Sequence, residues 1–184
     1  MGYILAHKLV IGYVLFRVKL YKQIFTHDLS KFTRYELVGG AEYVYRRITE
    51  ARYRKGDYPE RPASWFDHRK INSHHPEFWL DGENNPVMMT FESSLEMVCD
   101  IIASNRGFRK KKYWGYGKPS EYWSIHQKDA TVIHPHTKLF VGEMLTEFSK
   151  HGYGGLNKKL AFSIYRKIKE GVSMKATILW QANN

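Results

Sequence analysis

Cysteine is almost absent from this sequence of 184 residues, which contains a single one, Cys99. One thiol cannot form a disulfide within the chain, so a scaffold held together by disulfides is excluded. Cys99 lies in the apolar run LEMVCDIIA, which predicts a buried and chemically inert side chain. The lack of cysteine pairs favours a reducing, cytoplasmic setting.

Long hydrophobic runs are absent as well. The N-terminal stretch ILAHKLVIGYVLF comes nearest to one, but His7 and Lys8 interrupt it, and Arg17 and Lys19 end it. Its uninterrupted apolar part is far shorter than the ~20 residues that a membrane-spanning helix needs, and it does not fit a signal peptide. The stretch therefore predicts a buried core helix and no membrane partner.

Acidic residues are scarce relative to basic ones. The sequence has 18 Asp and Glu residues and 29 Lys and Arg residues, which gives a formal net charge of +11 and a pI near 9.6. An anionic partner, either a nucleotide or a nucleic acid, is therefore favoured at long range. The densest basic stretch, RGFRKKKYWGYGK, places Arg106, Arg109 and Lys110 before Tyr113 and Trp114. Basic and stacking side chains together suit single-stranded nucleic acid or a nucleobase, although a solvated loop with aromatics folded onto the core is the competing interpretation.

Alternating strand patterns are also scarce, and we find no internal repeat, low-complexity tract or linker. The pattern predicts an all-α fold with one main domain over residues 1–150 and a C-terminal helical extension over 151–184. We expect two helices within 120–152, separated by a turn near His134 and Pro135. Three of the other expected helices cover residues 3–24, 90–108 and 155–171. A fourth begins near residue 26 or 30 and ends near 55, with a possible break at Gly39 and Gly40. A fifth covers 63–75 and is ended by Pro76.

Histidine, by contrast, is plentiful in the first half of the chain. Neutral imidazole and carboxylate are ligands that suit zinc, manganese, iron and related divalent ions. The candidates are spread over 100 − 7 = 93 positions, which excludes a small zinc finger and predicts a site built inside a helical bundle. The candidate metal ligands are His7, His27, Asp28, His68, His74, His75 and Asp100.

The surroundings of several candidates fit a buried site. His7 belongs to a helix whose apolar face includes Ile11 and Val14, so His7 lies on or beside the buried stripe. Asp100 sits between LEMVC and IIA, where a carboxylate costs several kcal/mol unless it is paired, hydrogen-bonded or bound to a metal. His68 shares a helix face with Asn72.

Each candidate also has a simpler interpretation. A core histidine is most often hydrogen-bonded, and Asp28 is suited to cap a helix N-terminus. Asp100 has Arg106 and Arg109 nearby on its own helix as possible partners. These interpretations need a separate explanation for each residue, whereas one metal site explains all of them.

The stretch HDLSK at residues 27–31 resembles the signature of the HD superfamily of metal-dependent phosphohydrolases. In that superfamily the ligands follow the order His, His-Asp, often further histidines, and then Asp. His7, His27 with Asp28, the pair at 74 and 75, and Asp100 reproduce this order. Lys31 matches the HDxxK variant of HD-type phosphodiesterases. The resemblance implies an HD-domain-like helical bundle with a metal site in its core.

A closer likeness is to a family of small, uncharacterised phage and bacterial proteins. The motifs that carry it are AHKLV, HDLSKF, WFDHRKINSHHPEFW, EMVCD and YWSIHQKDATVIHPHTKLFV. The likeness runs from about residue 4 to 145 and leaves the chain after Gly152 uncovered. Ile101 stands where that family's pattern has Trp, a change that concerns packing more than chemistry.

From the superfamily resemblance we expect a metal-dependent phosphohydrolase, of the nucleotidase or phosphodiesterase type, with one or two divalent ions (Mn, Fe, Co, Zn or Mg). Its substrate would be a small phosphate ester, such as a nucleotide, in the cytoplasm of a bacterial host if the protein is phage-encoded. The alternative is a non-enzymatic nucleic-acid-binding or partner-binding phage protein with a structural metal. For the enzyme, the expected catalytic residues are Asp28, which would bridge two ions, and Lys31. The expected substrate-binding residues are Arg69, Asn72, Arg106, Arg109 and Lys110.

Overall fold

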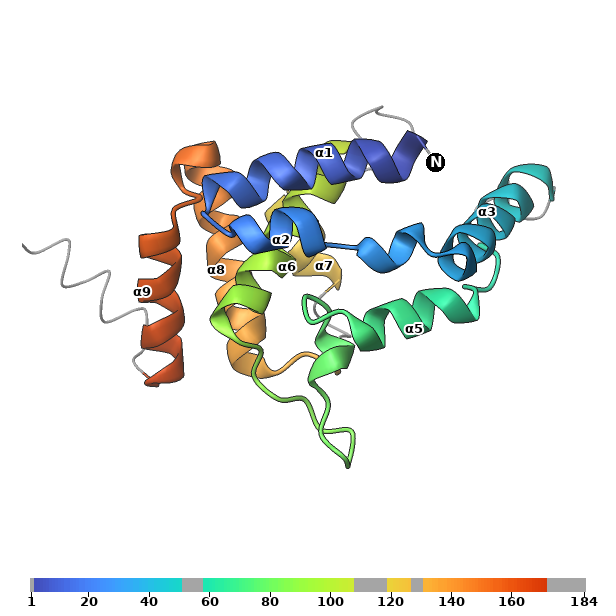
Figure 1. The fold of residues 1–184 in the computed structure, drawn as a ribbon. Helices are drawn as coiled ribbons and strands as arrows, with labels where there is room; N and C mark the ends of the chain where they lie inside the picture. The colour runs from blue at the N-terminus through green and yellow to red at the C-terminus, as the bar shows by residue number, and fades with distance from the viewer. Residues whose placement is uncertain (1, 51–57, 108–118, 127–130, 172–184) are drawn as a thin grey trace, which may run out of the picture.

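The computed structural model describes residues 2–50, 58–107, 119–126 and 131–171 (Figure 1). Over these residues the regular structure is helical throughout, with eight α-helices and no strand. A single isolated bridge between Leu80 and Pro86 is the only β-type pairing in the described ranges. The predicted all-α fold is confirmed.

The N-terminal segment forms two helices, α1 (Gly2–Arg17) and α2 (Tyr21–Thr26), so the prediction of one helix over 3–24 is wrong. Val18 and Leu20 are both buried. Residues two apart point to nearly opposite sides of a helix, so one continuous helix could not bury both. A left-handed backbone at Lys19 (φ 57) interrupts the helix, so that Val18 and Leu20 can both be buried. The break returns the chain toward α1, where Lys8 Nζ donates a hydrogen bond to the carbonyl of Phe25 (3.1 Å).

Helix α3 (Arg34–Thr49) begins where the Thr33 hydroxyl accepts a hydrogen bond from the amide of Glu36. It continues through Gly39 and Gly40, so the predicted break there is wrong. At Gly39 the lack of a side chain serves packing, because a Cβ would lie 2.4 Å from the hydroxyl of Ser64. Helix α3 thereby packs closely against α5 (Ala63–Ile71). The predicted continuation of α3 over residues 51–55 lies outside the described residues.

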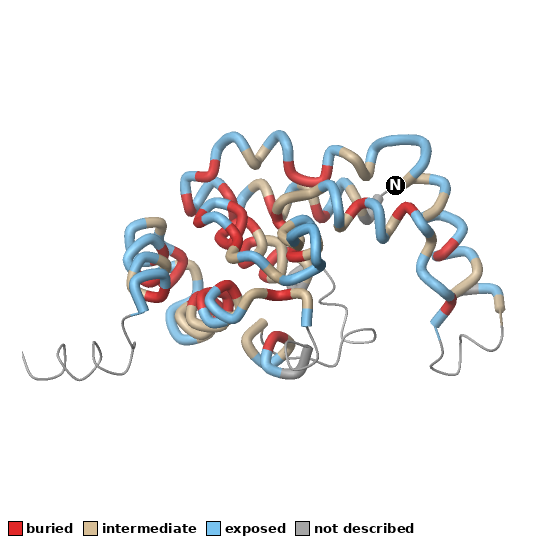
Figure 2. Tube along the Cα trace, turned by 90° about the horizontal axis from the view of Figure 1, so that it is seen from below, coloured by how far each residue is buried: buried red, intermediate tan, exposed pale blue. Residues whose placement is uncertain are grey.

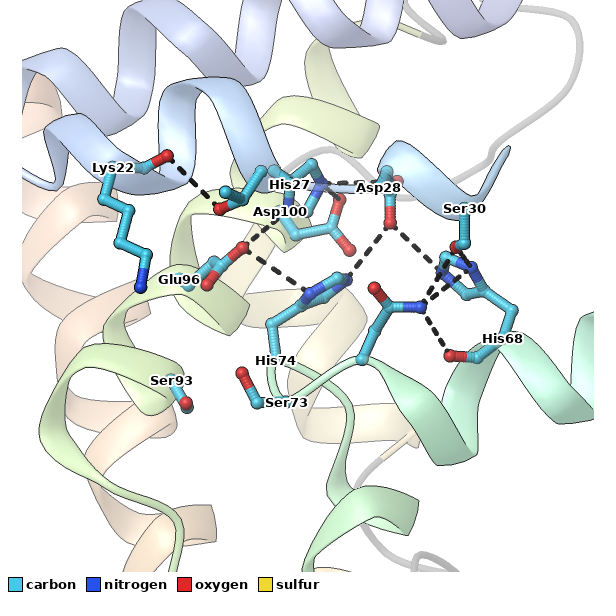
Figure 3. Close-up of polar contacts among 12 residues, drawn as sticks. Lys22, His27, Asp28, Ser30, His68, Ser73, His74, Ser93, Glu96 and Asp100 are labelled. Atoms are coloured by element: carbon cyan, nitrogen blue, oxygen red, sulfur yellow. Dashed lines mark hydrogen bonds and ion pairs between the residues drawn. The ribbon is translucent and has the colours of Figure 1, made fainter. Parts of the chain in front are cut away.

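Helix α5 ends at Ile71, so the prediction of a helix reaching His75 is wrong. Asn72 already has an extended backbone (φ −104, ψ 118), and Pro76 begins a short 3-10 turn, Pro76–Trp79. The two histidines at 74 and 75 therefore come from the turn between these elements. His74 projects from a different direction than His68 on α5 (Figure 3).

The hydrophobic core lies around α6 (Phe91–Gly107), which packs against α1, α8 (Pro135–His151) and α9 (Lys158–Lys169). Helix α7 (Pro119–His126) packs on α8. Leu95, Val98 and Ile102 are fully buried one turn apart on α6. Cys99 is buried as predicted. Buried positions follow the inward sides of the helices, and α3 and α5 lie at the opposite end of the molecule from α9 (Figures 1 and 2).

The predicted turn at His134 and Pro135 is confirmed, because Pro135 begins α8 and the His134 ring accepts a hydrogen bond from the amide of His136. In the predicted extension, α9 packs on the core. Ile164 and Ile168 are buried, and Tyr165 Oη donates to the carbonyl of Met89 (2.7 Å). None of the helices in the described ranges has both the length and the apolar character needed to cross a membrane.

Candidate metal centre

The seven predicted ligands converge from four parts of the fold, and Figure 3 shows five of them, His27, Asp28, His68, His74 and Asp100. Helix α1 supplies His7, the link after α2 supplies His27 and Asp28, α5 and the turn after it supply His68, His74 and His75, and α6 supplies Asp100. His7, His27, Asp28, His68 and His74 are buried, at 6%, 1%, 2%, 4% and 3% exposure. Residues 93 positions apart in sequence therefore share one buried site.

Asp28 lies at the centre of this cluster. Its Oδ1 is 3.1 Å from His68 Nε2 and 3.3 Å from His74 Nε2. Its Oδ2 is 3.3 Å from His27 Nε2 and 3.9 Å from His7 Nε2. The backbone of Asp28 is left-handed (φ 55, ψ 27) and its side chain makes no capping hydrogen bond. The helix-cap interpretation is therefore wrong, and the uncommon backbone conformation, which aspartate tolerates better than most residues, accompanies an inward-facing carboxylate.

Asp100 completes the opposite side of the cluster. Its Oδ1 lies 3.0 Å from His7 Nε2 and 3.8 Å from His27 Nε2, and Ser104 Oγ donates to it (3.3 Å). These contacts account for a carboxylate in an otherwise apolar helix. The arginines proposed as alternative partners are not placed, because the Arg106 side chain and Arg109 lie outside what the structure describes.

A second ring of polar groups holds the outer nitrogens of the histidines. His27 Nδ1 donates to Glu96 Oε1 (2.9 Å), which also lies 3.6 Å from His74 Nδ1. His68 Nδ1 lies 3.0 Å from Glu36 Oε2 and 2.9 Å from Ser30 Oγ. A carboxylate on one imidazole nitrogen fixes the orientation of the ring and makes the other nitrogen a better metal ligand.

Glu96, Glu36 and Ser30 were not predicted from the sequence. A signal was present for Glu96, which precedes Asp100 by four positions and so shares its helix face, turned toward the same cluster. Glu36 and Ser30 gave none, because Glu36 also fits a capping box with Thr33 and Ser30 fits an ordinary turn.

Several inward-facing atoms lie near polar atoms of their neighbours but make no well-directed hydrogen bond among the described residues. They are buried, and they include Asp28 Oδ1 and the Nε2 atoms of His27, His68, His74 and His75. Leaving one such atom unsatisfied costs about 1–3 kcal/mol, and native proteins rarely tolerate several together. The donors of Asp28, His68, His74 and His75 lie within 4.8 Å of one another, as do those of His7, His27 and Asp100. These donor sets fit a divalent metal ion, which would satisfy the atoms that hydrogen bonds do not.

The electrostatics of the cluster favour ionised carboxylates. Burial raises the pKa of Asp28, but the surrounding histidines and Lys31 outweigh it and hold that pKa well below its usual range. Likewise His7 keeps the pKa of Asp100 low against burial. Burial and the neighbouring His74 hold the pKa of His75 well below 6.5, so this imidazole is neutral and suited to bind a metal.

His27 differs from His75. Burial lowers its pKa, but contacts with Asp28 and Glu96 outweigh burial and raise it to about 9. Without a metal the cluster therefore holds a proton on His27 between two carboxylates. A metal ion at this position must displace that proton.

Lys31 lies beside the cluster, with Nζ 2.5 Å from Asp28 Oδ2. Burial lowers its pKa, but Asp28 outweighs burial and raises it, so the ammonium stays charged. The Lys31 side chain is 34% exposed, whereas that of Asp28 is 3% exposed. Lys31 thus places a positive charge at the boundary between the cluster and solvent.

The predicted substrate-binding residues fall into three groups. Asn72 lies at the cluster, where its Nδ2 donates to Ser30 Oγ (3.2 Å) and to the carbonyl of His68 (2.8 Å). Arg69 is engaged elsewhere, with Nη2 2.6 Å from Glu77 Oε1 and its guanidinium over the ring of Trp65. The remaining predicted residues, Arg109, Lys110 and the side chain of Arg106, lie outside the described part of the chain.

A comparison with family models matches residues 1–147 to DUF5662, which is described as a family of unknown function. The search of curated proteins gives no match, and neither does the search of solved structures. The matched range includes all seven predicted metal ligands and ends within α8.

Proposed function

The chain belongs to the DUF5662 family, and we propose that it is an HD-type metal-dependent phosphohydrolase acting on a nucleotide or a related phosphate ester. One observation carries the proposal, namely the convergence of Asp28 with His68, His74 and His75, whose donor atoms lie within 4.8 Å of one another and include inward-facing atoms without a well-directed hydrogen bond. The ligand order along the sequence and the lysine after the His-Asp pair support it.

Two donor sets would hold the metal. Asp28, His68, His74 and His75 form one set, and the other is His7, His27 and Asp100. Asp28 lies between the two sets, with one carboxylate oxygen toward each. Imidazole-rich sites of this kind suit manganese, iron, cobalt or zinc better than magnesium. A divalent ion supplies hydroxide at neutral pH by lowering the pKa of bound water to about 7, and it neutralises charge on phosphoryl oxygens.

Three side chains around the donor sets, Glu96, Glu36 and Lys31, would support this chemistry. Glu96 and Glu36 keep the rings of His27 and His68 in place through their outer nitrogens. Lys31 presents a charged ammonium at the edge of the cluster, where it would contact a phosphate oxygen and stabilise the charge that develops during phosphoryl transfer. The net charge of +11 draws an anionic substrate toward the protein.

The substrate-binding roles of two residues follow from where they lie. Asn72 orients its amide at the cluster and would bind a substrate oxygen from there. Arg69 would bind phosphate only after leaving Glu77, so we expect it to contribute less than Lys31.

The test combines elemental analysis with a hydrolysis screen of nucleotides and phosphate esters in the presence of manganese, iron, cobalt or zinc. Asp28→Asn should lose both metal and turnover. Lys31→Gln should keep the metal and lose about 100- to 1000-fold in kcat, the usual effect of removing one group that stabilises a transition-state charge. His136→Ala is the control, because His136 is exposed and lies outside the cluster. A wild-type protein that holds no metal and hydrolyses nothing under these conditions contradicts the proposal.

The strong positive charge also supports the second candidate, a nucleic-acid-binding or partner-binding protein with a structural metal. That candidate predicts salt-sensitive binding of DNA or RNA by the metal-loaded wild-type protein. It also predicts that chelation unfolds the wild-type chain, because the free energy of metal binding would then be free energy of folding. Turnover that depends on the metal in a chain that stays folded distinguishes the enzyme.

A further inference from the structure

Helix α1 is apolar on two opposite faces. Its inner face buries Ile11 and Val14 against α6. Leu5, Leu9 and Phe16 project from the other side of the same helix, about 180° away at 3.6 residues per turn, and are 52%, 77% and 59% exposed. A helix that is hydrophobic all round is normally enclosed on all sides. Among the described elements, only one side of α1 is packed against the core helices (Figure 1).

Helix α2 extends this exposed apolar surface. Tyr21 is 52% exposed and its ring lies 5.8 Å from that of Phe16, which joins the two helices. Phe25 is 73% exposed, and Lys8 of α1 donates to its carbonyl. We call the surface formed by Leu5, Leu9, Phe16, Tyr21 and Phe25 the outer face. Large apolar side chains that gather in the open on one face of a helix mark interaction sites in proteins.

The charged side chains of α1 and α2 are all of one sign. Residues 1–27 contain no aspartate or glutamate, and Asp28 is the first carboxylate of the chain. Arg17, Lys19 and Lys22 are exposed at the junction of α1 and α2, beside Phe16 and Tyr21. Apolar and aromatic side chains next to cations, without any carboxylate, complement a partner surface that is both apolar and negatively charged.

We propose that the outer face binds the surface of an anionic phospholipid membrane, with α1 and α2 lying in the plane of the interface. This inference is independent of the proposed hydrolase activity. Leu9 and Phe16 would enter the boundary between headgroups and acyl chains, and Lys19 and Lys22 would contact lipid phosphates. The 16 residues of α1 span about 24 Å, less than the ~30 Å hydrocarbon core, so the helix would rest on the membrane without crossing it.

A second copy of the chain fits the outer face less well. If the outer faces of two copies packed together, the only charged side chains that α1 and α2 would bring to this interface would be cations. No carboxylate precedes Asp28 in either copy. Interfaces of stable complexes pair opposite charges and avoid uncompensated like charges. Anionic lipid supplies the missing negative charge along the whole surface.

Vesicle co-sedimentation of the full chain tests the proposal. The wild-type protein should bind vesicles of phosphatidylcholine mixed with phosphatidylglycerol, and bind pure phosphatidylcholine at least several-fold more weakly. Leu9→Gln combined with Phe16→Gln should reduce binding by roughly tenfold or more, because two inserted apolar side chains are lost. Val44→Gln combined with Tyr45→Gln is the matched control. These residues are 52% and 67% exposed on α3, outside the outer face, and the change should leave binding unaltered.

The charge contribution needs its own pair of variants. Lys19→Asn, which suits the left-handed backbone at this position, combined with Lys22→Gln should weaken binding by roughly fivefold per charge and reduce its sensitivity to salt. Lys70→Gln with Lys169→Gln removes the same charge from exposed positions on α5 and near the end of α9, and should have a smaller effect. Circular dichroism and metal content should match the wild type in every variant.

Three results would overturn the proposal. The first is an absence of vesicle binding by the folded wild-type protein. The second is equal loss of binding in the outer-face and control variants. The third is a dimer, seen by sedimentation velocity without lipid, that Leu9→Gln with Phe16→Gln dissociates, because the outer face would then be an interface between two copies.

Discussion

Replacing Glu96 with glutamine tests whether the histidine cluster is arranged for a metal. Glu96 is 6% exposed, and its Oε1 accepts a hydrogen bond from His27 Nδ1 at 2.9 Å. The same oxygen is 3.6 Å from His74 Nδ1, beyond a normal hydrogen bond. Glutamine preserves the volume of the side chain and removes its charge. The change therefore acts on the orientation and basicity of His27 without removing any predicted metal ligand.

We expect Glu96→Gln to weaken metal binding by about 10- to 100-fold, which is about 1.4–2.8 kcal/mol. The lower part of this range would mean that only the His27 bond matters, and the upper part that His74 is also held by Glu96. Competition for cobalt or zinc against a coloured chelator measures the affinity directly. Glu92→Gln is the matched control, because Glu92 is exposed one turn earlier on α6 and loses the same charge.

Equal metal affinity in Glu96→Gln, Glu92→Gln and the wild type, with all three proteins folded, would refute the reasoning. It would mean that the buried histidines are held by hydrogen bonds alone and that the unsatisfied Nε2 atoms do not indicate a metal. A large loss of thermal stability in Glu96→Gln without a change in metal affinity would lead to the same conclusion.

Three further predictions follow from the same geometry. In chelator-treated protein the pKa of His27 is raised from 6.5 to about 9, so its stabilising contribution is full below pH 6.5 and lost as the pH rises through about 9. The free energy of unfolding measured with urea should then fall by up to about 3 kcal/mol, and a flat profile contradicts this. Gly39→Ala should destabilise the fold, because its methyl group would clash with Ser64. Gly40→Ala meets nothing within 4 Å and should stabilise the fold by about 0.5–1 kcal/mol. Calorimetry in which both variants change the free energy of unfolding in the same direction would contradict the close packing of α3 on α5. Metal removal should speed hydrogen exchange in α3 and α5 far more than in α6 and α8, and uniform acceleration would argue against a metal that ties these parts together.

Hydrophobic periodicity predicted the helical class because periodicity depends on the chain alone. It failed where a local pattern is overridden by packing. The apolar run of α1 and α2 reads as one helix, yet burying both Val18 and Leu20 requires the break at Lys19. Gly39 and Gly40 read as a helix breaker, yet Gly39 serves close packing inside α3. Tertiary contacts decide both cases, and these contacts join residues far apart in sequence.

The candidate site shows the same division. His7 and Asp100 were found because a polar group on an apolar helix face is costly and so needs a partner. The identity of those partners was beyond sequence reasoning. The pairing of His27 with Glu96 links positions 69 residues apart, and that of His68 with Glu36 links positions 32 apart. Such pairs depend on how α3, α5 and α6 are placed, which no local pattern encodes.

The cluster also has a structural role in joining two parts of the fold. Helices α3 and α5 pack mainly on each other and lie at the opposite end from α9 (Figure 1). Their polar link to the core runs through Glu36, His68 and Asp28. A metal between Asp28 and His68 would fasten this pair of helices to α1 and α6 through ligands from both sides. Catalytic and structural uses of the metal would then coexist, because the ion that activates water would also fix the position of the groups that surround a substrate.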